Sequence, residues 1–168
     1  IRTRLFSLAC KTGFGSLGPG TVVVPPCRLS NERAIHLGKG VYIGSHSWLQ
    51  VLPAELGGQA PTIRVGDNCS FSGFCTISAA SSISIEDSVL IARYVYIADH
   101  RHAYSNTQIP IRDQGISKIA PVTIKRGAWL GQGVIVCPGV TIGQGSVVGA
   151  NSVVTSSIPD YCIAAGSP

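Results

Sequence analysis

An aliphatic residue recurs at every sixth position through the C-terminal part of the chain. The residues that keep this spacing without interruption are Ile124, Leu130, Val136, Ile142, Val148 and Val154. An α-helix repeats its apolar face about every 3.6 residues and a half-buried strand about every two, so neither element accounts for the period. A repeat of six residues is a signature of the β-helix, in which short strands and corners alternate around a central core.

The same period runs through earlier parts of the chain. The residues in step are Leu37, Ile43 and Leu49, then Val65, Phe71 and Ile77, then Ile85, Ile91 and Ile97, and the segment from Leu17 to Ser30 is expected to start the series. When the aliphatic residue is counted as the first position, the fourth is often Gly or Asn, as in Gly127 and Asn151. These residues tolerate the positive φ of a sharp corner. The fifth position is usually small or β-branched, as at Ala128 and Ser152.

Each hexapeptide is therefore expected to form one short strand and one corner. Three of them would close a coil around inward-pointing aliphatic residues, and coils stacked about 4.8 Å apart would pair in parallel. The pattern predicts an all-β, parallel β-helix of roughly five coils, which forms a single domain over residues 1–168. A β-sandwich would instead place its strands at intervals of roughly 8–12 residues.

The composition limits the class of ligand. The chain has 168 residues, a formal net charge of +5 and only 12% charged residues, and its Lys and Arg residues form no run. A modest positive charge suits an anionic ligand such as a phosphorylated cofactor, and the scattered basic residues argue against nucleic-acid binding. The six cysteines contain no C-x-x-C pair, so we expect small buried hydrophobes of a reducing compartment rather than a zinc or redox site. No stretch approaches the roughly 20 apolar residues of a membrane span, and no secretory signal is recognised.

The period breaks after Ile97 and resumes at Ile124. The interval is polar, and we expect residues 103–121 to form a loop that leaves the β-helix and covers an active site, because long irregular segments in compact domains are usually functional or disordered. Tyr104 and Arg112 are its candidate substrate-binding residues. His100 and His102 stand at its start, and an imidazole can accept a proton near neutral pH.

The hexapeptide text resembles a known family of enzymes. The segments VLIARYVYIADHRH and PVTIKRGAWLGQGVIVCPGVTIGQGSVVGANSVVTSSIPDYCIAAGSP are similar to the left-handed β-helix acyltransferases of the sugar O-acetyltransferase type, which include the galactoside and maltose acetyltransferases. The stretch DHRHAYSNTQIPIRDQG most resembles the enzymes that acetylate capsule or lipopolysaccharide glycans. The resemblance implies a left-handed β-helix, acetyl-CoA as co-substrate without a metal, and a homotrimer with active sites between subunits.

The resemblance also implies roles for individual residues. Counted from Val89, His102 takes the place of the catalytic base, and His100 is expected to orient it or to bind substrate. The residues at matching acetyl-CoA positions are Trp129, Gly131, Gln132, Gly149, Ala150 and Thr155. Ser72, a third candidate substrate-binding residue, stands where the galactoside enzyme has an Asn near its acceptor sugar, and Ala80 stands where that enzyme has an acidic residue. The acceptor pocket is therefore expected to differ from that of the galactoside enzyme.

These observations predict an acetyl-CoA-dependent O-acetyltransferase acting on a sugar hydroxyl of a glycan. The alternative on the same fold is an N-acetyltransferase of an amino sugar or antibiotic. A γ-type carbonic anhydrase would need three histidine ligands, and the spacing of the four histidines, His36, His46, His100 and His102, does not resemble that pattern. A non-catalytic scaffold would have no use for paired histidines beside a long polar loop. We expect a cytoplasmic bacterial protein with a carbohydrate acceptor, and a lipid-linked acceptor would bring it to the inner face of the membrane.

Overall fold

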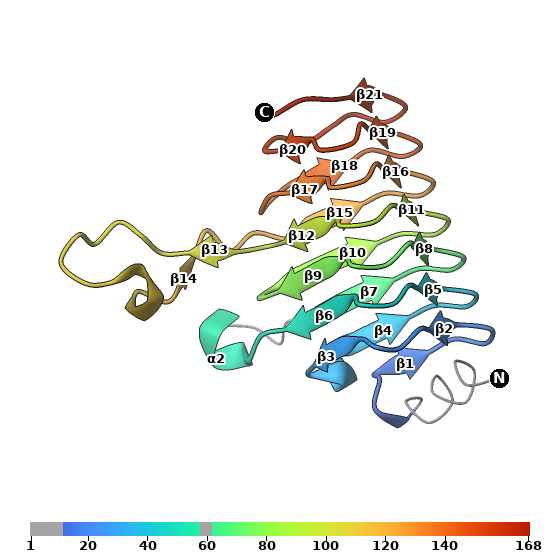
Figure 1. Ribbon diagram of the computed structural model, residues 1–168, viewed down its shortest axis with the longest axis horizontal. Coiled ribbons are helices and arrows are strands. Elements are labelled where there is room, and N and C mark those ends of the chain that lie inside the picture. The colour runs from blue at the N-terminus through green and yellow to red at the C-terminus, as the bar shows by residue number, and fades with distance from the viewer. Residues whose placement is uncertain (1–11, 58–61) are drawn as a thin grey trace.

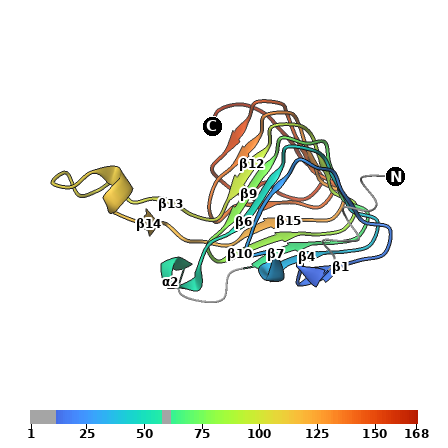
Figure 2. The same cartoon turned by 60° about the horizontal axis from the view of Figure 1, so that its bottom comes forward.

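The computed structural model describes residues 12–57 and 62–168, and these residues form a three-sided prism of short parallel strands (Figures 1 and 2). Sheet A contains, in spatial order, β1 (Ser16–Leu17), β4 (Ile35–Leu37), β7 (Thr62–Val65), β10 (Ser82–Ile85), β15 (Val122–Ile124) and β18 (Thr141–Ile142). Sheet B contains β2 (Val22–Val23), β5 (Tyr42–Ile43), β8 (Ser70–Phe71), β11 (Leu90–Ile91), β16 (Trp129–Leu130), β19 (Val147–Val148) and β21 (Ile163–Ala164). Sheet C contains β3 (Arg28–Ser30), β6 (Trp48–Val51), β9 (Thr76–Ala79), β12 (Tyr96–Ala98), β17 (Ile135–Val136) and β20 (Val153–Val154).

The chain visits sheets A, B and C in turn, which makes the expected left-handed parallel β-helix. The described residues form six complete coils, and a seventh begins with the bridge between Ile142 and Ile158 and ends with β21. The count is one more than the expected five, and coils differ in length. Val65 pairs with Leu37, and Ile124 pairs with Ile85, across insertions that a strict period cannot accommodate.

The six-residue period is the period of the core. Ile124, Leu130, Val136 and Ile142 are each fully buried and lie on successive sides of the prism. The same holds for the inward residues of earlier coils, such as Ile91. Each inward side chain stacks on its counterpart in the adjacent coils, so the core is one continuous column of aliphatic residues.

The fourth position of the hexapeptide forms the expected corner. The Gly and Asn residues there all have positive φ, and they are Gly40, Asn68, Gly127, Gly133, Gly139, Gly145 and Asn151. The fifth position is buried in nearly every coil, and its hydroxyl groups tie coils together. The Ser146 hydroxyl donates to the carbonyl of Pro159 (2.6 Å) and accepts the N–H of Cys162 (3.0 Å). Ser81 is at the fifth position counted from Ile77 but is only half-buried, since the inward residue there is Ile83.

The insertions gather at the edge where sheet C turns into sheet A. This edge holds the 3-10 helix η2 (Glu32–Ala34), the short helix α2 (Ala54–Gly57) and a long arm with β13 (Arg101–His102), the 3-10 helix η3 (Ile111–Asp113) and β14 (Ile116–Ser117). Figure 2 shows α2 and the arm on the same side of the prism. No helix within the described residues is long and apolar enough to cross a membrane.

The buried column predicts the effect of a single truncation. Ile83→Ala should lower the free energy of unfolding by about 2–5 kcal/mol, because it leaves a cavity in a core that cannot collapse; Ile83 is fully buried. The neighbouring outward change Ser84→Ala should alter it by less than about 0.5 kcal/mol. Chemical denaturation at one protein concentration measures both, and equal effects of the two changes would contradict the inward and outward assignment.

Candidate active site

The arm between β12 and β15 is an ordered hairpin rather than an irregular loop. Its base is closed by antiparallel pairing of Arg101 with Ser117 and of His102 with Ile116. Its outer part is organised by Gln114, whose side-chain amide donates to the carbonyls of Asn106 (2.7 Å) and Ile109 (3.0 Å). In Figures 1 and 2 the arm projects away from its own prism. The arm includes residues 103–117 of the segment for which a loop was expected, and it extends outward.

Asp99 joins the base of the arm to the prism. Its side chain is fully buried, and its carboxylate oxygens accept the N–H groups of Ala80 and Ser81, both at 2.7 Å. Its backbone carbonyl accepts the N–H of Ala120 at 2.8 Å, where the chain returns from the arm. One residue thus fixes the start of the arm, the end of the arm and the corner of the preceding coil.

The same carboxylate holds the ring of His100. Nδ1 of His100 lies 3.0 Å from Oδ1 of Asp99, and the His100 side chain is only 11% exposed. This contact leaves Nε2 as the ring nitrogen available to a ligand. His102 is exposed, and its backbone carbonyl accepts the Ser117 hydroxyl at 3.4 Å. His100 precedes β13 and His102 ends it, so the two histidines stand at the base of the arm.

The candidate substrate residues of the arm face solvent in the isolated chain. Tyr104 is 57% exposed, and the guanidinium of Arg101 lies 4.9 Å from its ring centroid. The Arg112 side chain is 88% exposed and lies 3.4 Å from the Asp113 carboxylate. Ile109 and Ile111 are also exposed on the arm. An arm that presents apolar side chains away from its own prism has surface to bury against another molecule.

The candidate cofactor residues lie along a different edge, where sheet B turns into sheet C. The residues on or beside this edge are Trp129, Gly131, Gln132, Gly149 and Ala150, and the candidate substrate-binding residue Ser72 lies on the same edge two coils away. The N–H of Asn151 donates to the carbonyl of Gln132 at 2.7 Å, so the corners of consecutive coils are in direct contact. The structure therefore brings these residues together in one row.

The packing of the coils explains why glycine occupies positions 131 and 149. A Cβ on Gly131 would lie 2.7 Å from the amide nitrogen of Ala150, and one on Gly149 would lie 2.9 Å from the Cβ of Ala165. Both glycines are needed so that one coil can pack on the next. Their lack of a side chain is explained by this packing, without a ligand close to the backbone.

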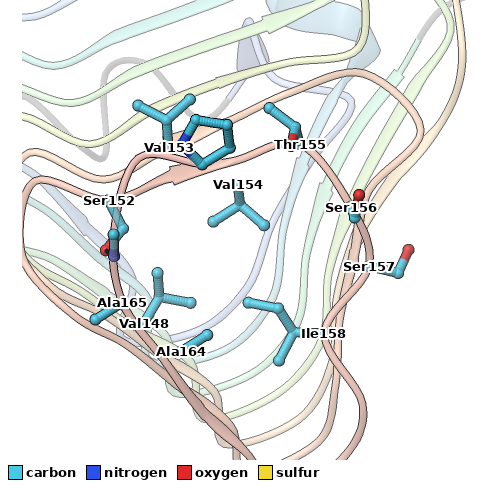
Figure 3. A pocket seen from close by; sticks show the side chains of 12 residues that line it. Val148, Ser152, Val153, Val154, Thr155, Ser156, Ser157, Ile158, Ala164 and Ala165 are labelled. Carbon is cyan, nitrogen blue, oxygen red and sulfur yellow. Dashed lines mark hydrogen bonds between the residues drawn. The ribbon is translucent and has the colours of Figure 1, made fainter.

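The histidines and the cofactor row are separated by one side of the prism. Sheet C runs between their two edges, a span of roughly 15–20 Å at about 3.3 Å per residue. Thr155 is on the edge of the histidines, after β20, rather than on the edge of Gln132. It lies on the rim of a hollow at the C-terminal end of the prism, which Val148, Val154 and Ile158 also line (Figure 3). A single chain does not assemble the candidate residues into one site.

The buried cysteines are poor candidates for a covalent step. Burial raises the pKa of the Cys69 thiol to about 11 and also raises that of Cys75. Their Sγ atoms lie 2.9 Å from the carbonyl of Glu86 and 3.2 Å from that of Ala92. Both therefore remain protonated thiols near neutral pH. Within residues 12–57 and 62–168, no three His, Cys, Asp or Glu side chains are grouped to hold a metal ion.

Comparison with known proteins identifies the family. Residues 121–156 match the family model described as bacterial transferase hexapeptide (six repeats). The putative lipopolysaccharide biosynthesis O-acetyl transferase WbbJ of Escherichia coli K12 is 33% identical over 174 residues, covering all of this chain and 81% of the relative. The chain belongs to the hexapeptide transferase family. Its sequence resemblance to that family is thereby confirmed.

Two further relatives agree with this placement. A probable acetyltransferase of Mycobacterium tuberculosis is 40% identical over 146 residues, and the matched part is 80% of this hexapeptide transferase but only 48% of the relative. The crystal structure of AntD, an N-acyltransferase from Bacillus cereus in complex with dTDP and 3-hydroxybutyryl-CoA, superposes with a TM-score of 0.81 at 22% identity, covering 97% of this chain and 84% of AntD. The latter likeness concerns the fold. Both sequence relatives are named acetyltransferases, so the expected class of enzyme, an acyltransferase, is confirmed at the level of the family.

Sequence reasoning missed Asp99. The available signal was its place two residues after Ile97, on the inward phase of the strand, where an acidic residue needs several hydrogen-bond donors. The donors come from residues 80 and 81, and the sequence does not show that this corner lies beside Asp99.

We expect Asp99→Asn to loosen the base of the arm. An amide presents one oxygen where the carboxylate presents two, so a buried N–H loses its acceptor, and the free energy of unfolding should fall by about 1–3 kcal/mol. Hydrogen exchange of the Ala80, Ser81 and Ala120 amides should accelerate. The matched control is Asp113→Asn on the exposed arm, which should change stability by less than about 0.5 kcal/mol. Unchanged protection of the Ala80 and Ser81 amides would show that Asp99 does not hold the base of the arm on the prism.

Proposed function

We propose that this hexapeptide transferase is an acetyl-CoA-dependent O-acetyltransferase that acts on a sugar hydroxyl of a glycan, at sites formed between neighbouring copies of the chain. The observation that carries the proposal is the position of the two groups of candidate residues on two different edges of one prism. Each group is incomplete alone. An outward-pointing arm can bring its histidines to the cofactor edge of a second copy, in keeping with the intersubunit sites that the family resemblance implies.

The surface of the prism favours such an assembly. The outward row of sheet B includes Tyr42, Leu90 and Trp129, which are each more than 40% exposed, and the row of sheet C includes Tyr96 and Ile135. The outward row of sheet A is polar, with residues Ser16, His36, Arg64, Ser84, Thr123 and Thr141. Two different apolar faces on one chain suit a heterologous contact that closes into a ring, and we propose the homotrimer.

The edge between sheets B and C suits an anionic donor. Its corners, residues 24–27, 44–47, 72–75, 92–95, 131–134 and 149–152, contain Arg93 and no Asp or Glu. The edge between sheets A and B holds Asp67, Glu86, Asp87 and Asp160 instead. The pantetheine arm of acetyl-CoA would lie along Gln132 and Ala150, beside Trp129, and an edge free of carboxylates does not repel the phosphates.

The proposed reaction is direct transfer. His102 removes the proton of the acceptor hydroxyl, the alkoxide oxygen attacks the thioester carbonyl, and the tetrahedral intermediate expels the thiolate of CoA. The proton held on the imidazole then passes to the thiolate. Backbone N–H groups of the edge are the candidate donors to the oxyanion. None of these steps calls for a metal ion or an acyl-enzyme, and the protonated state of Cys69 and Cys75 agrees with a direct mechanism.

His100 is the second candidate for the base, and one observation favours it. The Asp99 carboxylate fixes its ring through Nδ1, an arrangement that orients an imidazole for proton transfer. We assign proton removal to His102 because it takes the place of the family base, and we assign to His100 the positioning of the acceptor hydroxyl. An alcohol requires a base more than an amine does, which is why we favour a hydroxyl acceptor over the amino group of an amino sugar.

The proposed compartment follows from the donor. Acetyl-CoA is a cytoplasmic metabolite, so we place the enzyme in the cytoplasm. A lipid-linked glycan acceptor would bring it to the inner face of the membrane.

The two histidines are expected to differ in kinetic effect. His102→Ala should lower kcat by at least about 100-fold, the usual contribution of a general base, while His100→Ala should mainly raise KM for the acceptor. Calorimetric binding of acetyl-CoA, at about one site per chain, is the control that both variants retain the cofactor site. More than a tenth of wild-type kcat in His102→Ala would remove it as the base, and a larger kcat loss in His100→Ala would move the role there.

Sites shared between copies predict complementation between two inactive chains. His102→Ala disables the arm, and Ala150→Trp blocks the cofactor edge. Co-expression of the two chains with different affinity tags yields mixed trimers, in which one of three sites combines an intact arm with an intact edge. We expect about a third of wild-type activity in them. Each homogeneous variant should be inactive, and an absence of recovery in mixed oligomers would place both groups in a site within one chain.

A further inference from the structure

Three consecutive coils place an aromatic ring at the same corner of the prism. His46, Phe74 and Tyr94 occupy the fourth hexapeptide position on the edge between sheets B and C, with φ of 61°, 56° and 62°. The next two coils have Gly133 and Asn151 at this position. Positive φ is unfavourable for a bulky L-residue, and Gly and Asn are the residues that adopt it readily. Three rings in succession at such a position need an explanation beyond the corner itself.

The three rings form a column along the edge. The rings of His46 and Phe74 are stacked, with centroids 4.5 Å apart and planes 6° from parallel. The rings of Phe74 and Tyr94 are tilted, with centroids 5.1 Å apart. The guanidinium of Arg93 lies 4.7 Å from the centroid of Phe74 and 5.5 Å from that of Tyr94. Tyr94, the uppermost ring, is therefore held from below and from the side, yet it is 49% exposed.

The column ends directly below the proposed acetyl-CoA residues. The N–H of Gly133 donates to the carbonyl of Arg93 at 2.9 Å, so the corner of Gly131, Gln132 and Gly133 packs on the corner of Arg93 and Tyr94. Since Gly133 has no side chain, no ring continues the column above Tyr94. The Asn151 carboxamide lies where a Cβ of Gly133 would be, and the half-exposed ring of Tyr94 lies on the same edge as Ser72 and the proposed acetyl-CoA residues.

A half-exposed aromatic ring beside the proposed acetyl-CoA residues suits the acceptor sugar. A pyranose ring has an apolar face of C–H groups that packs on an aromatic ring, while its hydroxyls stay free for hydrogen bonds. Arg93 has no carboxylate within ion-pairing distance among the described residues, and the edge contains no acidic residue. Its guanidinium can therefore bind a negative group on the sugar.

Building on the proposed function, we propose that Tyr94, supported by Phe74 and His46, is the platform on which the acceptor pyranose stacks, and that Arg93 selects an acceptor with a negative charge. The acceptor class is thus an anionic glycan. The histidines on the arm of the neighbouring copy carry out the acetyl transfer.

The test uses Tyr94→Asn, since Asn adopts positive φ and the change removes only the ring. Saturation-transfer NMR measures binding of a panel of methyl pyranosides and the matching methyl uronides to the full chain. We expect about tenfold weaker pyranoside binding in Tyr94→Asn, with acetyl-CoA affinity unchanged by calorimetry. Arg93→Gln should abolish the preference for uronides. The matched control is Tyr161→Asn, because Tyr161 also has positive φ (57°) and is exposed, on the edge between sheets A and B.

Three outcomes would overturn the platform. The first is unchanged pyranoside binding in Tyr94→Asn. The second is dissociation of the oligomer by that change, because the ring would then be a subunit contact. The third is a wild-type protein that binds acetyl-CoA but no pyranoside. Failure of the wild type to bind acetyl-CoA would instead overturn the proposed function.

Discussion

The structure depends on the hydrogen bonding of one coil to the next. A coil of three two- to four-residue strands has no hydrogen-bonded partner within itself and buries its aliphatic residues only when another coil covers them. The strands of sheets A, B and C pair in parallel through the whole stack. The hydroxyl of Ser146 and the closely packed Gly131 serve the same coil-to-coil contact. Every inward position is thereby committed to packing, and chemistry is confined to the edges and outer faces.

The three edges have different properties because each tolerates different changes. The edge between sheets A and B holds two ion pairs, Lys125 with Asp160 at 3.1 Å and Arg126 with Asp87 at 3.6 Å. The edge between sheets C and A accepts insertions, and there the arm with its histidines leaves the prism. The edge between sheets B and C keeps short corners without acidic residues, and it combines the cofactor row with the aromatic column. In the proposed enzyme, the edge between sheets C and A of one copy meets the edge between sheets B and C of another.

Asp99 links fold and site. A fully buried carboxylate is stable only with several donors, and it obtains them from Ala80, Ser81 and His100. The same contacts fix the arm on the prism and the imidazole on the arm. The position of the histidines is consequently set by the packing of two coils as much as by the arm.

The sequence alone determined the repeating features of the structure, which are the strands and corners of each hexapeptide. The spacing of Ile124, Leu130 and Val136 predicted the parallel coils, the Gly and Asn residues predicted the positive-φ corners, and the break after Ile97 predicted the arm. Such features are local, since each hexapeptide specifies its own strand and corner. Tertiary structure decided which corners meet. The contacts of Asp99 with Ala80, of Phe74 with His46 and Tyr94, and of Gly131 with Ala150 each join residues of different coils. Coil length varies with the insertions, so these neighbours are fixed only when the inward residues align in the stacked core.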